Sequence, residues 1–342
     1  MKDKNRGLRI ALKILCTIEA LVLILLAGGT FYIHHMLGKI NRVDQQMMTQ
    51  EEVEQYLSTE PTETVSPDFT GPTMSGEDVD WGEDVDATIG KTEQIVNILL
   101  IGQDRRPGQA RSRSDTMILC TINTKTKTLT MTSFLRDLYV QIPGYGSNKM
   151  NAAYVWGGME LLNQTLEKNF GIHVDGNIEV DFTQFAKIVD LLGGVEMELR
   201  KDEARWINMA AEYGSLTEGL QRLDGTQAML YSRIRSLDGD GDFSRTNRQR
   251  KVINSIIGGV KDSSLSELLS LLNEVLPMVT TDMSNTEIIG YATDMFPMLS
   301  GINIVSQRVP ADRMYYGAMI DGMACLVADM NKTRAMLQET LG

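Results

Sequence analysis

Three apolar runs lie close together in the middle of the chain, and they constrain its fold more than any other feature. They are IVNILLIG at 95–102, TMILCTIN at 116–123 and TLTMTSFL at 128–135. Their length and their aliphatic and β-branched side chains are typical of buried strands. The polar segment TKTK separates the last two runs and indicates a turn. We therefore expect three consecutive strands, and we assume that they pair as an antiparallel meander.

Helical periods follow the strands. Apolar residues recur every three or four positions in two segments, at Met159, Leu162, Leu166 and Phe170 and at Phe182, Phe185, Val189 and Leu192. Glycines follow both segments and predict their ends. Further helices are expected near 202–213, 225–232, 245–260, 265–275, 285–298 and 331–340, and further strands at 195–199 and 302–309. Strands interleaved with helices indicate an α/β layer architecture.

Charged side chains stand where the strands of the meander end. Asp104 follows the first strand, Arg113 and Asp115 precede the second, and Arg136 follows the third. In an antiparallel meander these three places share one edge of the sheet. Guanidinium groups there favour an anion, and carboxylates beside them favour a hard cation such as Mg²⁺, which is often held by one or two carboxylates with water and substrate phosphate. The plainer alternative is two surface ion pairs of little energetic weight.

A second basic stretch, YSRIRSLDGDGDFSRTNRQRK at 231–251, carries six basic and three acidic residues. If its start is extended, Arg233 and Arg235 point to one face. On the helix that follows, Arg245 and Gln249 lie one turn apart near the N-terminus, where backbone N–H groups favour anions. Several arginines aimed at one place fit a doubly charged pyrophosphate.

The same stretch has a plainer interpretation. Ser244 is expected to cap the helix, and Arg250 lies off the helix face that carries Arg245 and Gln249 and is expected in solvent. The basic helix start would then simply be balanced by the nearby acids Asp238, Asp240 and Asp242. The acidic run lacks the spacing of an EF-hand calcium loop.

The N-terminus predicts a membrane anchor. Residues 14–37 form a 24-residue, mostly apolar stretch, and about 20 such residues cross a bilayer as a helix. The preceding segment 1–13 contains five basic residues, which the positive-inside rule keeps in the cytoplasm. The run is longer than the apolar core of a signal peptide. We expect a single uncleaved transmembrane helix, with residues 38–342 outside the cytoplasm.

Residues 38–92 read as an acidic, disordered linker. Fourteen acidic residues and one basic residue lie between Asp44 and Val96, so this segment alone has a net charge of −13. Because the whole chain has a net charge of −12, the rest of it sums to +1. A segment so polar cannot bury enough apolar surface to order itself, although Phe69 and Trp81 could dock locally. Cys120 and Cys325 lie in apolar runs and are expected to be buried, with a disulfide as the alternative.

Six ordered motifs resemble the LytR–CpsA–Psr family of membrane-anchored cell-wall proteins. They are NILLIGQDRR, RSRSDTMIL, FLRDLYV, KMNAAY, GLQRLDGTQAMLYSRIR and DFSRTNRQRKVI, spread over a motif core at 97–261. The resemblance implies an α/β catalytic domain at 93–342 with a central mixed sheet flanked by helices, closed by an extension at 262–342. It also implies transfer of an anionic glycopolymer, such as a teichoic acid or capsular polysaccharide, from a polyprenyl-pyrophosphate carrier to peptidoglycan. The acceptor is the primary hydroxyl of N-acetylmuramic acid.

The resemblance also assigns roles to residues at matching positions. Asp104 and Asp115 would hold Mg²⁺ against the pyrophosphate. Its oxygens would be bound by Arg113, Arg136, Lys149, Arg233, Arg235, Arg245 and Gln249. The family's groove for the polyprenyl chain would be lined by apolar helix faces, with Leu162, Leu166, Phe182 and Phe185 as candidates; plain core packing is the alternative for each.

The chain departs from the family pattern in FLRDLYV, where Leu135 and Leu138 replace the usual Pro and Thr, which puts the shape of this turn in doubt more than its chemistry. Asp137 is a candidate general base, with an N-cap or salt-bridge role as the equal alternative. Two other functions stay open: a non-catalytic sensor or scaffold that binds polyprenyl pyrophosphate, and a pyrophosphatase that uses water. No nucleic-acid partner is expected, and the sequence leaves the glycopolymer unspecified.

Overall fold

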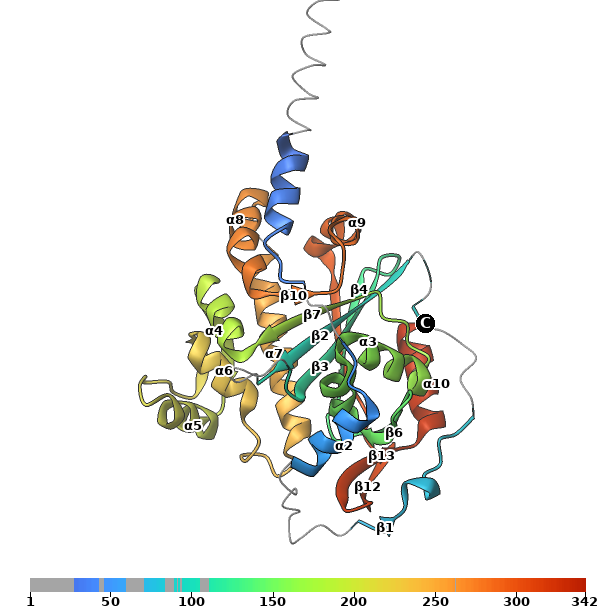
Figure 1. The fold of residues 1–342 in the computed structure, drawn as a ribbon. Helices are drawn as coiled ribbons and strands as arrows, with labels where there is room; N and C mark the ends of the chain where they lie inside the picture. Colours follow the sequence, from blue (N-terminus) through green and yellow to red (C-terminus); the bar gives the residue numbers. More distant parts are fainter. Residues whose placement is uncertain are drawn as a thin grey trace, which may run out of the picture.

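The computed structural model describes residues 28–42, 46–59, 71–83, 89–90, 92, 94–104, 111–261 and 263–342. In this part of the chain six strands form one sheet in the order β10–β7–β2–β3–β4–β11 (Figure 1). Their bounds are β2 (Ile95–Gln103), β3 (Ser114–Asn123), β4 (Thr128–Phe134), β7 (Gly176–Asp181), β10 (Thr280–Thr281) and β11 (Asn303–Val309).

The predicted meander is confirmed. β2 pairs antiparallel with β3, and β3 pairs antiparallel with β4. β7 joins β2 and β11 joins β4 as parallel neighbours, and β10 closes the other edge antiparallel to β7. The sheet is therefore mixed, as the family resemblance implied.

Helices cover both faces of this sheet (Figure 1). Alternate strand residues point to opposite faces: Leu99 and Leu119 belong to the core beneath α3 (Met150–Phe170), whereas Ile98 and Ile118 belong to the core beneath α7 (Asp242–Val260). The first core also holds residues of α10, and the second holds residues of α9. These two helices are α10 (Met330–Leu341) and α9 (Asn285–Met295). Helix α8 (Leu265–Val275) packs in a separate small cluster with residues 33–40.

Helix α3 ends as its sequence predicts. Gly171 adopts a left-handed conformation (φ 66°), and its N–H donates to the carbonyl oxygen of Glu167 at 2.9 Å. Gly158 interrupts the helix with φ 64°, a conformation that L side chains rarely adopt. The short hairpin that precedes α3 consists of β5 (Tyr139–Ile142) and β6 (Gly146–Lys149).

A smaller cluster stands beside the central sheet. The hairpin of β8 (Val195–Leu199) and β9 (Gly219–Leu223) packs with three helices around Val195, Ile207 and Tyr231. The helices are α4 (Phe182–Leu191), α5 (Lys201–Ala211) and α6 (Gly225–Arg233). The alternation of VEMEL thus forms the predicted strand.

Residues 263–342 are integral to the domain, not an appended extension. They supply β10 and β11 at the two edges of the central sheet. They also form the hairpin of β12 (Tyr315–Ile320) and β13 (Met323–Ala328), beside which β1 (Thr73–Met74) lies parallel. The described residues also form three 3₁₀ turns: η1 (Gly76–Asp78), η2 (Leu276–Met278) and η3 (Phe296–Gly301).

The expected basic tail and most of the expected anchor lie outside the described residues, which begin at 28. Residues 28–37 are helical, and Met36 and Leu37 are buried against Leu276 of η2. Among the residues that the structure describes, no helix is long and apolar enough to cross a membrane.

The expected linker at 38–92 is in part folded against the domain, which corrects the prediction of disorder. Helix α2 (Gln50–Thr59) buries Val53 in the core beneath α3. Trp81 stacks on Tyr139 with 5.8 Å between ring centroids. Apolar side chains spaced among the acids, too few to give a periodic signal, are therefore enough to dock these segments. Phe69 lies outside the described residues.

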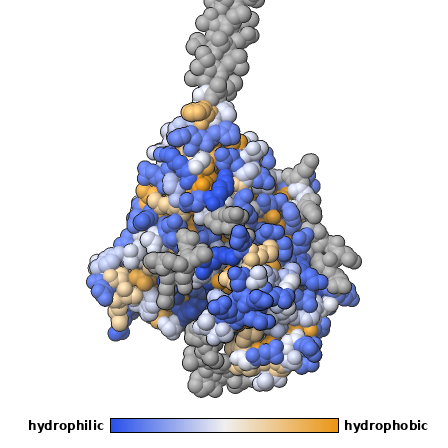
Figure 2. Space-filling view, viewed as in Figure 1, coloured by the Kyte–Doolittle hydropathy of each residue, from blue (hydrophilic) through white to orange (hydrophobic). Residues whose placement is uncertain are grey.

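The surface of the domain visible in Figure 2 is largely polar, and its two cysteines are buried. The face shown in Figure 2 is largely hydrophilic, with small separate apolar patches. Cys120 and Cys325 are both buried and neither forms a disulfide, so the expected small apolar role is confirmed.

Candidate functional site

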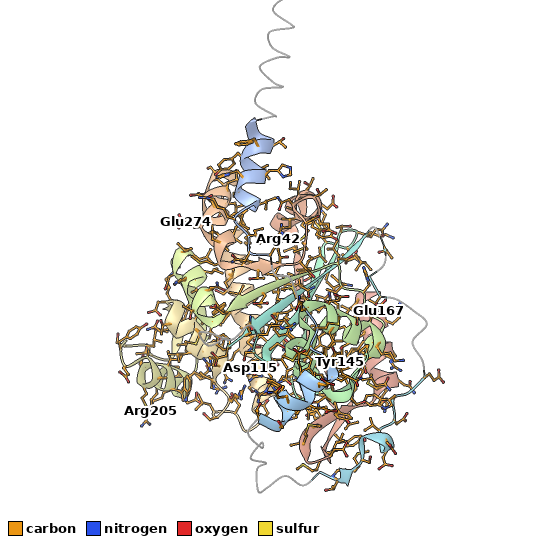
Figure 3. The ribbon with its side chains drawn as sticks, viewed as in Figure 1. Arg42, Asp115, Tyr145, Glu167, Arg205 and Glu274 are labelled. Atoms are coloured by element: carbon orange, nitrogen blue, oxygen red, sulfur yellow. The ribbon has the colours of Figure 1, made fainter. Side chains whose placement is uncertain are left out.

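The meander brings charged residues together at one edge of the central sheet. Arg136 lies two residues beyond β4, and its Nη1 donates to Oδ1 of Asp115 near the start of β3 at 2.8 Å. Figure 3 shows Asp115 at the lower end of the central sheet. The predicted approach of these two side chains is therefore confirmed.

An irregular strand pairing sets the position of Asp115. Gly102 pairs with Thr116, but the next residue, Gln103, pairs with Ser114, so Asp115 has no partner on β2. Such a bulge re-aims the extra side chain and increases the local twist. The sequence carries no signal for this bulge.

Gln103 ties together the two ends of the loop between β2 and β3. Its side-chain oxygen accepts the backbone N–H of Ser112 at 3.1 Å, and its amide nitrogen donates to the buried carboxylate of Glu179. Tyr154 donates its hydroxyl to the same carboxylate. The neck of the loop that begins with Asp104 is thus fixed by a buried polar network.

The start of α7 completes the charged cluster with Asp242. This carboxylate lies 2.8 Å from Nε of Arg136, 3.2 Å from Nε of Arg235 and 3.0 Å from Nη2 of Arg245. Oδ1 of Asp115 lies 3.7 Å from Arg235 and 4.0 Å from Arg245. Two carboxylates therefore hold three convergent guanidinium groups, and only Asp242 among these five was not predicted as a site residue.

The charges of this cluster are strongly coupled. Burial lowers the pKa of Arg136, but Asp137, Asp242 and Asp115 together raise it well above its usual range. Burial raises the pKa of Asp242, against the opposite effect of Arg136 and Arg235. Arg136 is therefore charged at neutral pH.

Asp104 forms a second, more exposed part of the site. Its Oδ2 lies 3.3 Å from Nη2 of Arg233, and both side chains are nearly half exposed. The guanidinium of Arg233 stacks over the ring of Phe182, 4.6 Å from its centroid. Arg113 makes a longer hydrogen bond, 3.4 Å, to the side chain of Asn151.

Lys149 lies beneath the cluster. Its side chain is only 3% exposed, and its Nζ lies 3.2 Å from Asp137. Asp137 also lies 3.4 Å from Nε of Arg136. Two cations thus hold Asp137, which fits the salt-bridge alternative for this residue.

The donor set fits a hard cation. Asp104 and Asp115 offer partly exposed carboxylate oxygens at the same sheet edge, and Mg²⁺ is commonly held by one or two carboxylates while water and substrate phosphate fill the other positions. Within the described ranges, no group of three or more His, Cys, Asp or Glu side chains could hold a metal alone. A metal here would therefore depend on substrate oxygens.

An apolar cavity of about 240 Å³ lies next to these charges, between the sheet, α4, α6 and α7. Phe182 and Phe185 line it, as predicted. Its other apolar lining residues are Leu100, Ile101, Ile178, Val180, Ile188, Val252, Ile253 and Ile256. Ser232 and Gln249 add polar groups, and Oε1 of Gln249 is buried without a hydrogen-bond partner in the described part of the chain. The cavity is therefore apolar over most of its lining and has a polar group, Gln249, on α7, the helix that also carries Arg245.

Leu162 and Leu166 do not line this cavity, which corrects the prediction. Both are fully buried in the core beneath α3, with Met159 and Phe170. This core lies on the opposite face of the sheet from α7. Periodicity identifies the buried side of a helix but cannot tell which face of a sheet that side covers.

Two local expectations around α7 were also wrong. Arg233 ends α6, and Ile234 forms its C-cap, so Arg233 and Arg235 reach Asp104 and Asp242 from a helix end and a loop instead of one strand face. Helix α7 begins at Asp242, so Ser244 lies inside the helix and does not cap it as expected.

Arg250 is buried, although it was expected in solvent. Its side chain lies between α7 and β4, where Nη1 donates to Oγ of Ser133 at 2.6 Å. Burial, with a further effect from Arg308, lowers its pKa to about 10. Among the described residues it has no carboxylate partner. A position outside one apolar stripe can still face a second buried surface.

Comparisons with known proteins agree with this arrangement. The family model described as LytR_cpsA_psr matches residues 43–341. Regulatory protein MsrR of Staphylococcus aureus (strain COL) is 39% identical over 168 residues, 48% of this chain, and the chain spans about half the length (49%) of that relative. The Bacillus licheniformis protein named polyisoprenyl-teichoic acid–peptidoglycan teichoic acid transferase TagU is 32% identical over 253 residues, which is 72% of this chain and 78% of TagU.

Solved structures share the fold. Bacillus subtilis TagT superposes with a TM-score of 0.59 and 27% identity, covering 79% of this chain and 99% of TagT. A TagT structure with bound octaprenyl pyrophosphate lipid gives a TM-score of 0.57 at 27% identity, covering 77% and 98% of the two chains. Because the family model spans nearly all of the described domain, this chain belongs to the LytR–CpsA–Psr family.

Proposed function

We propose that this protein is a membrane-anchored phosphotransferase of the cell wall. It would move an anionic glycopolymer from a polyprenyl-pyrophosphate carrier to the primary hydroxyl of N-acetylmuramic acid in peptidoglycan. One observation carries the proposal: three convergent guanidinium groups adjoin an apolar cavity. A pyrophosphate head joined to an isoprenoid tail needs both environments side by side.

The charges would allow a substrate phosphate to take the place of a carboxylate as the ion-pair partner of the arginines. Arg136, Arg235 and Arg245 are held by Asp115 and Asp242. Phosphate oxygens accept the same charge-assisted bonds and suit the planar geometry of guanidinium groups. A pyrophosphate would therefore compete with these carboxylates for the arginines, and Asp115 would become available to a cation.

The relatives support the substrate class. TagU relatives bear the name of a teichoic acid transferase acting on peptidoglycan, and TagT structures hold octaprenyl pyrophosphate or species named LI-WTA and LIIa-WTA. We extend that class to this chain. Phe182 and Phe185 would contact the isoprenoid, and Gln249 would hydrogen-bond at its phosphate end.

In the proposed reaction, the sugar hydroxyl attacks the phosphorus that carries the glycopolymer. The new P–O bond completes a phosphodiester, the P–O bond to the polyprenyl phosphate breaks, and the hydroxyl proton passes to the leaving phosphate or to solvent. Asp104 and Asp115 would hold Mg²⁺, which would offset negative charge on the non-bridging and leaving oxygens. The arginines would position the diphosphate in line with the hydroxyl.

The proposed location follows from the N-terminal sequence. The apolar stretch at 14–37 would anchor the chain in the bacterial cell membrane, with the basic segment 1–13 in the cytoplasm and the domain outside it. A reaction driven by a pyrophosphate bond of its own substrate suits a compartment without ATP.

The test uses the full-length protein in detergent with synthetic lipid-linked donor, Mg²⁺ and peptidoglycan oligomers, and identifies the products by mass. A glycopolymer–peptidoglycan phosphodiester supports the proposal. Release of phosphorylated glycopolymer without acceptor would favour the pyrophosphatase, and binding without product would favour the sensor or scaffold. Either of these results overturns the transferase.

A further inference from the structure

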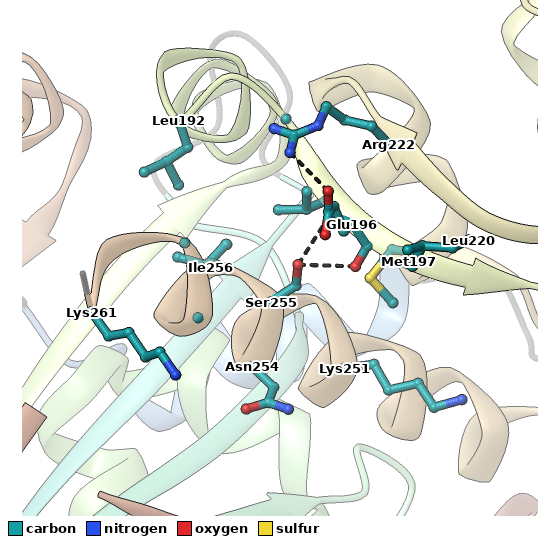
Figure 4. A pocket seen from close by; sticks show the side chains of 14 residues that line it. Leu192, Glu196, Met197, Leu220, Arg222, Lys251, Asn254, Ser255, Ile256 and Lys261 are labelled. Atoms are coloured by element: carbon teal, nitrogen blue, oxygen red, sulfur yellow. Dashed lines mark hydrogen bonds and ion pairs between the residues drawn. The ribbon is translucent and has the colours of Figure 1, made fainter. Parts of the chain in front are cut away.

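The outer side of α7 borders a second cleft, distinct from the apolar cavity. It has a volume of about 650 Å³ and lies between α7, the end of α4 and the β8–β9 hairpin (Figure 4). Helix α7 lies between the two spaces: Val252 and Ile253 line the apolar cavity, Lys251 and Asn254 line the cleft, and Ile256 borders both. The proposed transfer reaction makes no use of this cleft.

The cleft carries an excess of positive charge. Arg222 pairs with Glu196 at 2.9 Å, and the hydroxyl of Ser255 bonds to the backbone N–H and C=O of Glu196 at 3.1 Å and 3.0 Å. Lys251 and Lys261 also line it, and within the described residues neither ammonium group has an ion-pair partner. Among the lining residues that the structure describes, three cations therefore stand against one carboxylate.

The chemistry of the lining selects an extended anion. None of the described residues that line the cleft is aromatic, so they offer no apolar platform on which neutral sugar rings can pack. Lys251 and Lys261 are ten positions apart, which corresponds to about 15 Å along a helix. Two separated ammonium groups, with the amide of Asn254 between them, suit a ligand that repeats negative charges along a polar chain. The volume lies in the usual range of ligand sites, about 300–1,000 Å³.

We propose that this cleft is a second site for the anionic glycopolymer and holds phosphate-bearing repeats remote from the pyrophosphate. The identity of the polymer rests on the proposed function. Arg245 and Gln249 lie on the same helix, and Lys251 is about 9 Å along its axis from Arg245. A polymer of several repeats can occupy both ends of α7, whereas a donor with a single repeat occupies the reaction end alone.

The test compares Lys251→Gln/Lys261→Gln with Lys125→Gln/Lys168→Gln, a control pair that removes two exposed lysines elsewhere. Full-length protein in phosphatidylcholine nanodiscs is assayed for binding of a poly(glycerol phosphate) oligomer, with dextran as the neutral probe. The cleft variant should bind the oligomer about five-fold more weakly, as expected for two exposed ion pairs. The wild-type advantage should shrink as salt rises.

Transfer is measured with donors of one repeat and of many repeats. The cleft variant should raise KM for the long donor by the same factor and leave kcat and the short donor unchanged. An equal effect on both donors, or no difference from the control pair, would overturn the second site. If no donor is transferred, the proposed function fails while oligomer binding still decides the cleft. The assay is repeated in nanodiscs that contain phosphatidylglycerol. If the only difference is that the cleft variant no longer prefers phosphatidylglycerol over phosphatidylcholine nanodiscs, the cleft binds lipid headgroups and the glycopolymer site is refuted.

Discussion

Arg248 offers the sharpest test of how the site is supported. Its Nε donates to Glu203 at 2.9 Å, its Nη1 donates to the carbonyl oxygen of Ile234 at 3.2 Å, and its Nη2 pairs with Asp238. Both Arg248 and Glu203 are about 95% buried. Arg248 therefore links α7 to α5 and holds the loop between α6 and α7, which carries Arg235.

Arg248→Met would leave the carboxylate of Glu203 buried, with only Arg200 nearby, at 3.8 Å. Removing one partner of a buried ion pair costs about 3–5 kcal/mol. At roughly 2–4 °C per kcal/mol for a large domain, the melting temperature should fall by about 10 °C. Activity should fall as well, because the loop with Arg235 loses two of its anchors.

The assay is thermal unfolding followed by circular dichroism, together with donor turnover. Glu203→Gln combined with Arg248→Met should recover much of the loss in stability, because no uncompensated charge then remains in the pair. Arg205→Met, at an exposed site on the same helix as Glu203, is the matched control and should have little effect. A loss below about 1 kcal/mol in the single variant, or a double variant no better than the single, would refute this reasoning.

Three other predictions follow from the same structure. Arg250→Met should leave the free energy of unfolding, measured in urea, unchanged or raise it, because the charged side chain is buried without a carboxylate. In the wild type, the cost of burying this charge should disappear only as pH rises above the lowered pKa of about 10. A marked loss of stability in the variant at neutral pH would contradict this. Asp104→Asn and Asp115→Asn should each abolish transfer with little change in melting temperature, and wild-type turnover in either variant under defined Mg²⁺ would remove the metal from the mechanism. Cys120 should resist a thiol reagent at pH 8 until the protein is unfolded, because burial raises its pKa to about 12, and rapid labelling of the native protein would contradict the packing of β3.

Local patterns predicted the elements and much of the candidate site. Continuous apolar runs are sufficient for buried strands, and Gly171 adopts the left-handed conformation that ends α3. Strand order then brings Asp115 and Arg136 into contact, because consecutive antiparallel strands exchange ends at one edge. Asp242 was missed because its spacing from Asp238 and Asp240 carries no sign of which carboxylate meets the arginines of the site.

By itself the sequence determined the strands of the meander, most helix segments and the charged residues available to them, since these depend on side-chain size and periodicity over a few positions. Only the tertiary structure decided which buried face each helix covers. It placed Leu166 in a core across the sheet from the cavity, buried Arg250 against β4 and gathered three arginines on Asp242. The physical reason is that these outcomes depend on residues far apart in the chain, whose distances are set by packing and pairing and leave no periodic signal in the sequence.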